Sequence, residues 1–242
     1  MEEGEIIRLA KYCDEKLSFS MMAIRPEYRY QSLPLCVIDA VFSMNVKYKG
    51  VQNVIKRYCD YFHLKENRKS EEYPPIEEQQ SIETLIANYD NNGIEYFTDQ
   101  IYRNRQRTST TNGILKSEAV YKFAKTLEKF KVNYFQDIIK ICYDETNKLF
   151  KEKISLIPGQ KSGKCLNYFF MLSAPWEYSK NLIKPDRMVI RFLENGLKRK
   201  VDPIESSQII LDTCEYLRNK YPELTPLIMD NRIWEFQSNQ KD

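Results

Sequence analysis

The sequence predicts an all-α protein, and three observations lead to this fold class. Apolar residues recur at helical spacing in most segments, as at Val51, Val54, Ile55 and Tyr58. No segment alternates apolar and polar residues with the period of two that marks a β-strand. The 242 residues include only 7 glycines, which is few for a protein built from many strands and tight turns. We therefore expect helices joined by loops throughout.

Helical periodicity places the expected helices in order along the chain. Residues 35–42 are nearly all apolar and predict a central helix that is buried on all sides. Charged residues around Pro74-Pro75 indicate a loop over 65–80, and a polar, basic loop covers 103–113. The expected helices cover residues 5–20, 35–42, 51–62, 81–89, 93–103, about 114–130, 134–150 and 165–172.

Capping residues punctuate the C-terminal third of the chain. A short helix beginning near Met188 should stop at Gly196. Asp202-Pro203 and Thr225-Pro226 each combine a good N-cap with a proline in the first turn, which predicts two further helix starts.

The composition excludes several classes of protein. The six cysteines show no metal-ligand spacing, so we expect buried free thiols in a reducing compartment and no metal bound by side chains. His63 is the one histidine, which argues against a zinc site or a histidine-based triad. No apolar run approaches the roughly 20 residues of a membrane span, and no signal peptide is evident. We expect a soluble cytoplasmic protein without a membrane partner.

The stretch from Ile157 to Lys164 carries the first sign of chemistry. Its glycines permit positive φ, so it predicts a tight turn that opens a helix. Exposed backbone amides next to a helix N-terminus bind anions, and phosphate is the anion that we expect here. The net charge of +3 is compatible with nucleic-acid binding if the basic residues cluster. Taken alone, the Pro-Gly turn is also compatible with an ordinary helix connector.

These residues resemble the helix-hairpin-helix DNA glycosylases of the endonuclease III (HhH-GPD) superfamily. Ile157-Pro158-Gly159 matches the family's hairpin, and Lys184-Pro185-Asp186 matches the segment with its catalytic aspartate. Upstream, Ala40 to Asn45 resembles the family's apolar helix and following turn, with Asn45 at the glutamine position. Asn112 to Lys116 resembles the entry to the middle helix. The resemblance implies a two-lobed helical fold with a central cleft, in which 33–172 form one lobe and 1–32 with 173–242 form the other.

The resemblance also implies roles for individual residues on double-stranded DNA. Asp186 would be the catalytic carboxylate, although an aspartate there is also a common N-cap. Asn45 would fill the gap left by a flipped nucleotide, or would simply be a turn residue. Trp176 and Tyr178 would line a base pocket. The expected DNA contacts are Gly159, Gln160, Lys161, Ser162, Gly163, Lys164, Asn45, Arg107 and Lys116.

Departures from the family pattern define the expected reaction. Gly163 stands where bifunctional members carry a Schiff-base lysine, so we expect hydrolysis by a monofunctional monomer without lyase activity. The chain lacks the family's four-cysteine cluster, so no iron–sulfur centre is expected. No cofactor is required, while K⁺ or Na⁺ is compatible with the hairpin carbonyls. The alternatives are a non-catalytic helix-hairpin-helix DNA-binding protein and a helical interaction protein without a nucleic-acid role.

Overall fold

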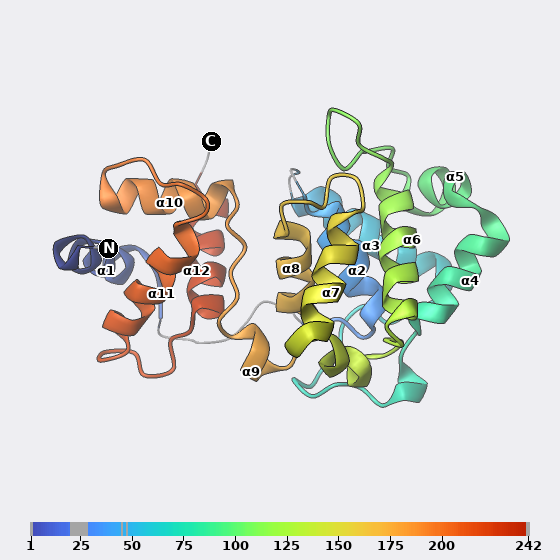
Figure 1. Cartoon of the computed structure of the whole chain (residues 1–242), viewed down its shortest axis with the longest axis horizontal. Coiled ribbons are helices and arrows are strands. Elements are labelled where there is room, and N and C mark those ends of the chain that lie inside the picture. Colours follow the sequence, from blue (N-terminus) through green and yellow to red (C-terminus); the bar gives the residue numbers. More distant parts are fainter. Residues whose placement is uncertain (1, 20–28, 45, 47, 241–242) are drawn as a thin grey trace. The chain divides into compact units, whose positions relative to one another are not determined.

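The computed structural model describes residues 2–19, 29–44, 46 and 48–240, which form helices and connecting loops (Figure 1). These residues contain no β-strand, only two isolated bridges between extended residues. The predicted all-α class is therefore confirmed for the described part of the chain.

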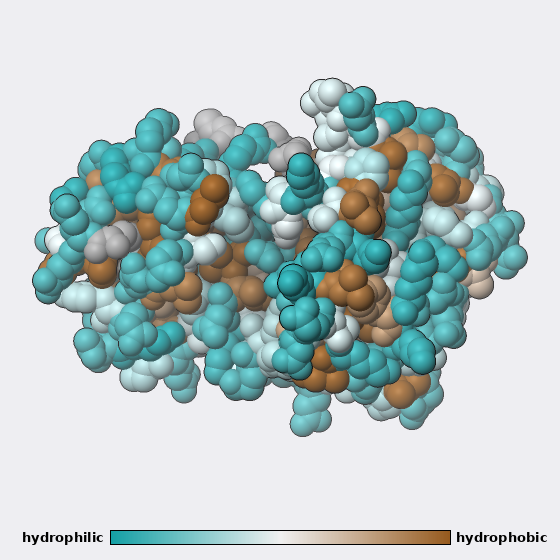
Figure 2. Space-filling model, viewed as in Figure 1, coloured by the Kyte–Doolittle hydropathy of each residue, from teal (hydrophilic) through white to brown (hydrophobic). Residues whose placement is uncertain are grey.

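Two compact units make up the chain. The terminal unit comprises residues 1–25 and 176–242, and the central unit comprises residues 26–175. The boundaries expected from the sequence lie at 32/33 and 172/173. Hydrophilic side chains cover most of the visible face of each unit, interrupted by small hydrophobic patches (Figure 2).

Helix α2 is the centre of the central unit because every one of its residues is buried. It packs against α3, α6 and α8, so an apolar residue finds a neighbour on each side of the helix. Burying one large aliphatic side chain contributes about 1.5–3 kcal/mol, which explains why a short helix can organise the unit. The helices of this unit are α2 (Leu33–Phe42), α3 (Tyr48–Phe62), η2 (Ile76–Glu78), α4 (Ile82–Asn92), α5 (Ile94–Tyr96), η3 (Phe97–Tyr102), α6 (Lys116–Lys129), η4 (Phe135–Ile141), α7 (Asp144–Ser155) and α8 (Lys164–Ser173).

Two expected helices of this unit are interrupted. The segment expected as one helix over 134–150 forms the 3₁₀ helix η4 and then α7. The break falls at Asp144, whose φ of 59° lies in the left-handed region. The side-chain amide of Asn147 then donates to the carbonyl of Ile141 at 2.7 Å, which satisfies an acceptor exposed by the break. The segment over 93–103 likewise divides into α5 and the π-helical η3.

The terminal unit is a small bundle formed by the two ends of the chain. Helix α1 packs on α10 and α11, and α10 packs on α12. Leu9, Phe192 and Met229 are among its fully buried residues. Its helices are α1 (Glu3–Lys16), α9 (Trp176–Ser179), α10 (Arg187–Leu197), α11 (Ser206–Leu217) and α12 (Pro226–Ser238).

Gly196 does not end α10, contrary to the expectation. It lies inside the helix, and Lys198, with a φ of 59°, is the left-handed cap. A Cβ at position 196 would approach Leu9 Cδ1 at 2.6 Å and Tyr12 Cδ1 at 2.8 Å. Glycine is therefore needed here for close packing of α1 on α10 and not for termination.

The two expected C-terminal helix starts have different outcomes. Thr225 caps α12 as predicted, because its side chain accepts the amide of Ile228. The prediction at Asp202 is wrong by several residues. Asp202 accepts the amide of Ile204 at 2.7 Å in a turn, and α11 begins only at Ser206.

Candidate nucleic-acid interface and catalytic carboxylate

A hairpin of eight residues, 156–163, joins α7 to α8. Two successive turns build it: the amide of Gln160 donates to Ile157 O at 2.9 Å, and that of Gly163 donates to Gln160 O at 3.1 Å. Gly159 and Gly163 have φ values of 85° and 72°, which glycine adopts without strain. The predicted glycine turn that opens a helix is therefore present.

Gly159 touches the basic loop that precedes α6. A Cβ at position 159 would lie 2.5 Å from Thr108 Cβ and 3.0 Å from Thr108 O. Such distances are far below van der Waals contact, so only glycine allows this approach. The hairpin and the loop around Thr108 consequently lie side by side in the central unit.

The hairpin amides are only partly available to a ligand. The Gly163 amide is used inside the hairpin, so its expected contact with phosphate is wrong as far as the amide is concerned. The amides of Lys161, Ser162 and Lys164 donate to no backbone acceptor among the described residues. Lys161 and Ser162 are exposed and Lys164 is half-buried. An anion approaching the N-terminus of α8 would meet these amides and two ammonium groups.

Gln160 does not fit the expected contact with DNA. Its side chain is 2% exposed, and its Oε1 is buried without a hydrogen-bond donor in the described part of the chain. The alternation of the two turns directs this side chain into the unit while its neighbours face outward. A buried acceptor of this kind carries a desolvation cost of about 1–3 kcal/mol.

Lys116 is also buried, and this overturns its expected contact with DNA. The residue is 1% exposed, and its ammonium donates to Phe42 O at 2.9 Å, Met44 O at 2.8 Å and Gln106 Oε1 at 3.4 Å. A lysine ammonium has three donors, and these three acceptors use them all. Lys116 therefore caps the C-terminus of α2, where the last helical carbonyls otherwise lack partners.

Arg107 lies at the base of an exposed loop. Its guanidinium donates to Gly113 O at 2.5 Å, and the amide of Thr108 donates to Ile114 O at 2.9 Å. These bonds close the loop over 108–113, whose tip residues 110–112 are exposed. Arg107 itself is exposed, so its remaining donors can reach a ligand.

Three segments thus gather at one end of the central unit. Lys116 joins the end of α2 to the start of α6, and Thr108 joins the loop before α6 to the hairpin before α8. In Figure 1 the loop before α6 and the hairpin lie together at the upper end of this unit. Asn45, expected to fill the gap in DNA, lies outside the described residues, and its role stays a prediction.

Asp186 caps α10 in the terminal unit. Its Oδ1 accepts the amides of Met188 at 2.8 Å and Val189 at 3.2 Å. Its Oδ2 accepts no hydrogen bond from the described residues, and the side chain is partly exposed. One oxygen is therefore held by helix amides while the other is open to water or a ligand. The N-cap interpretation is confirmed, and it leaves the carboxylate chemically usable.

The aromatic residues expected to line a base pocket lie on α9. Trp176 is 42% exposed and Tyr178 is half-buried. Glu177 of this short helix forms a surface ion pair with Lys180, the residue that follows the helix. The exposed indole of Trp176 is available for stacking on a base.

A hydrogen-bonded network around Asp39 is a feature that the sequence pattern hides. Asp39 is fully buried, and its Oδ2 accepts the hydroxyls of Tyr30 at 2.8 Å, Tyr48 at 3.1 Å and Tyr168 at 3.4 Å. Burial, and next the charge of Asp39, raise the pKa of Tyr30. The network ties α2 to the first residue of α3 and to α8. Asp39 is the one charged residue in the apolar segment 33–42, and this charge is the only sign of the network in the sequence.

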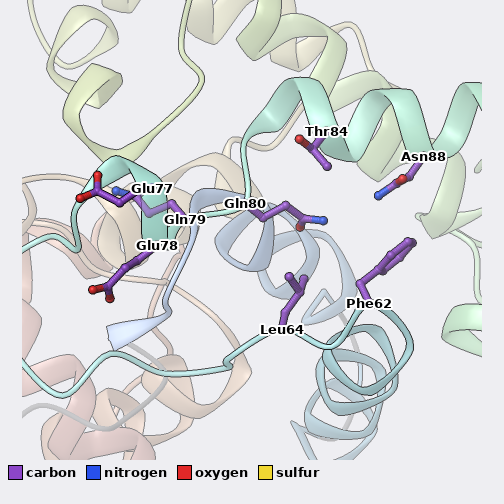
Figure 3. Close-up of a pocket in the computed structure, with 8 residues that line it drawn as sticks. All are labelled: Phe62, Leu64, Glu77, Glu78, Gln79, Gln80, Thr84 and Asn88. Carbon is purple, nitrogen blue, oxygen red and sulfur yellow. The ribbon is translucent and has the colours of Figure 1, made fainter.

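An open hollow lies in the central unit between the end of α3 and α4. In Figure 3 the side chains of Phe62, Gln80 and Asn88 point toward one another, whereas Glu77 and Glu78 turn away. None of the expected site residues lines it. The lining residues are Phe62, Leu64, Glu77, Glu78, Gln79, Gln80, Thr84 and Asn88.

The described residues were also compared with what a metal site or a membrane span requires. Among the described residues, no three histidine, cysteine, aspartate or glutamate side chains gather as a metal site. All six cysteines are buried free thiols, as predicted. In the described part of the chain, no helix is both long and apolar enough to cross a bilayer.

Comparison with known families gives one match. The model of the family described as Domain of unknown function (DUF8548) matches residues 7–238. No curated protein and no solved structure matches the chain.

Proposed function

The chain belongs to the family described as Domain of unknown function (DUF8548), and we propose that it is a DNA N-glycosylase. It excises a damaged or modified base from double-stranded DNA by hydrolysis, as a cytoplasmic monomer. The fold that accompanies this proposal is the two-lobed helix-hairpin-helix glycosylase fold. The observation that supports it most is the hairpin over 156–163, with its left-handed glycines and open amides at the start of α8.

The hairpin holds the DNA backbone in this proposal. The amides of Lys161, Ser162 and Lys164 bind a phosphate, and the two lysine side chains add charge. Arg107 contributes a further phosphate contact from the neighbouring loop. Because the hairpin, this loop and the end of α2 share one end of the central unit, a single stretch of duplex can meet all of them.

Asp186 does the chemistry in this proposal. Cleavage of the glycosidic bond develops positive charge on the deoxyribose, and a carboxylate stabilises that charge. Oδ1 is fixed by the amides of Met188 and Val189, so Oδ2 is the atom that faces the sugar or orients the attacking water. Trp176 and Tyr178 stack on the extruded base.

No covalent intermediate is needed for this reaction. Gly163 occupies the place of the family's Schiff-base lysine, and its φ of 72° favours glycine there. The side chains of the flanking Lys161 and Lys164 bind the phosphate and not the sugar in this proposal. Water is therefore the nucleophile, and the product is an abasic site with an intact backbone.

A monovalent cation at the hairpin is compatible with the donor set. K⁺ and Na⁺ bind oxygen atoms, and the buried Oε1 of Gln160 lacks a donor in the described structure. The carbonyls of Pro158 and Gly159 accept no backbone amide in the described part of the chain. A cation held by these atoms would offset phosphate charge beside the hairpin. We propose no other cofactor and no iron–sulfur centre.

The Asp186→Asn variant tests the proposal most directly. Asparagine caps a helix as well as aspartate does, so the fold and DNA affinity should persist. Base release should fall by about 10²- to 10³-fold, because the charge that stabilises the transition state is lost. The measurement is alkaline strand cleavage of duplexes that carry a panel of damaged and modified bases. Asp202→Asn is the matched control, since Asp202 also accepts an amide in a turn before a helix of the same unit.

Each outcome separates the proposal from its alternatives. A non-catalytic DNA-binding protein would bind the duplexes with a salt-dependent affinity and release no base. A helical interaction protein would show no salt-dependent affinity for DNA. Equal release by wild type and Asp186→Asn would remove Asp186 from the mechanism.

A further inference from the structure

The segment that carries Asp186 is an arm bound to α12. Residues 180–186 run without regular structure from α9 to α10 and lie beside α12 (Figure 1). The amide of Leu227 donates to Lys180 O at 3.0 Å, which anchors the start of the arm. The amide of Lys184 donates to Asp230 Oδ1 at 2.9 Å, which anchors the arm two residues before Asp186.

A short chain of hydrogen bonds leads from Asp230 to Asp186. Lys184 donates its amide to Asp230, and its carbonyl accepts the amide of Asp186 at 2.6 Å. Pro185 stands between Lys184 and Asp186, and its fixed φ restricts the backbone there. It has no amide hydrogen that could compete for the carboxylate of Asp230. The carboxylate of Asp186 is then held from the other side by α10. The peptide unit around Lys184 thus transmits the position of α12 to Asp186.

Burial makes Asp230 unusual among acidic residues. It is 4% exposed, and aspartate is rarely buried unless partners satisfy it. Replacing buried charged groups by apolar residues of similar size is often neutral or stabilising, so stability alone does not explain a buried carboxylate. Its carboxylate accepts the Lys184 amide, which gives this buried side chain a role in holding the arm.

We propose that Asp230 is a positioning residue for the catalytic carboxylate Asp186. This inference rests on the proposed glycosylase function. Asp230 holds the arm through the Lys184 amide and so sets the location of Asp186 Oδ2 against the sugar. It touches neither DNA nor the reacting atoms.

The expected effect is on turnover and not on binding. A misplacement of a reacting group by about 1 Å can cost about 10²-fold in rate. Asp230→Ala frees the arm, so kcat for base release should fall by roughly 10- to 100-fold while KM for the duplex stays within about twofold. Asp230→Asn keeps an acceptor for the Lys184 amide and should restore most of the rate.

Thr225→Ala is the matched control in the same helix. Thr225 caps α12 by accepting the amide of Ile228, and no hydrogen bond joins its side chain to the arm in the described structure. Its loss weakens the first turn of α12 but leaves the bond between Asp230 and the Lys184 amide in place, so base release at a temperature well below unfolding should be unchanged. Amide hydrogen exchange supplies a readout independent of activity: the Lys184 amide should lose protection in Asp230→Ala and keep it in Thr225→Ala.

The outcomes distinguish failure of the inference from failure of the proposed function. Wild-type protein that releases no base from any duplex refutes the glycosylase function and, with it, the inference. Wild-type release with an unchanged kcat in Asp230→Ala refutes the inference alone. A loss of rate in Thr225→Ala equal to that in Asp230→Ala also refutes it, since the effect would then follow the stability of α12.

Discussion

Replacing Lys116 by methionine separates a structural role from a DNA contact. The ammonium gives charged hydrogen bonds to Phe42 O and Met44 O at the end of α2. Such bonds contribute about 1.5–3 kcal/mol each, and an apolar isostere recovers part of the loss by removing a buried charge. We therefore expect Lys116→Met to lower the free energy of unfolding by about 2–4 kcal/mol.

The assay is thermal unfolding followed by DNA binding. At about 2–4 °C per kcal/mol for a chain of this size, the melting temperature should fall by roughly 4–16 °C. Lys122→Met is the control, because Lys122 lies on the same helix in an exposed pair with Glu118 and should cost less than about 1 kcal/mol. The salt dependence of DNA affinity should be the same in both folded variants. A stable Lys116→Met protein whose salt slope falls by about one would refute the buried cap and restore the phosphate contact.

Two further predictions concern stability. Gly159→Ala should lower the free energy of unfolding by about 2–4 kcal/mol, because position 159 has a positive φ and a Cβ there would lie 2.5 Å from Thr108 Cβ. Gly163→Ala also has a positive φ but open space around it, so it should lower the free energy of unfolding by only about 1 kcal/mol. Urea unfolding measures both. Equal losses would show that the loop does not press on the hairpin. Hydrogen bonds from Arg199 lower the pKa of both Glu5 and Glu205 in the folded protein. The two ion pairs therefore stabilise the fold fully above about pH 4.5, and this contribution is lost as the pH falls through the lowered pKa values of the two carboxyl groups. Arg199→Met should therefore reduce the acid-dependent drop in melting temperature between about pH 6 and 3, and an unchanged drop would contradict the assignment.

Local sequence patterns predicted the helices well where capping and periodicity agree. Thr225-Pro226 specifies its own helix start, because the hydroxyl and the ring act on neighbouring residues. The same pattern at Asp202 is satisfied within a turn, so α11 begins later. Asp144 breaks an otherwise continuous apolar period through its backbone conformation, which periodicity does not report.

Part of the candidate site was also within reach of the sequence. The glycine spacing of the hairpin indicates positive φ at Gly159 and Gly163, and both adopt it. The Pro-Asp pair indicates an N-cap, and Asp186 is one. The pattern does not determine which individual side chains are exposed to a ligand. In the sequence, Lys116 looks like an exposed residue at a helix start and Gln160 like a polar turn residue, yet both side chains are buried.

The sequence by itself determines the all-α class, the central apolar helix and the glycine hairpin, because these depend on residues within a few positions of one another. Only the tertiary structure decides what each polar side chain does. Lys116 caps α2 across 72 to 74 positions of chain, and Asp230 holds an arm 46 positions away. A lysine or aspartate meets such partners only after distant helices pack. Burial then removes water and turns what the sequence presents as a surface charge into a structural bond.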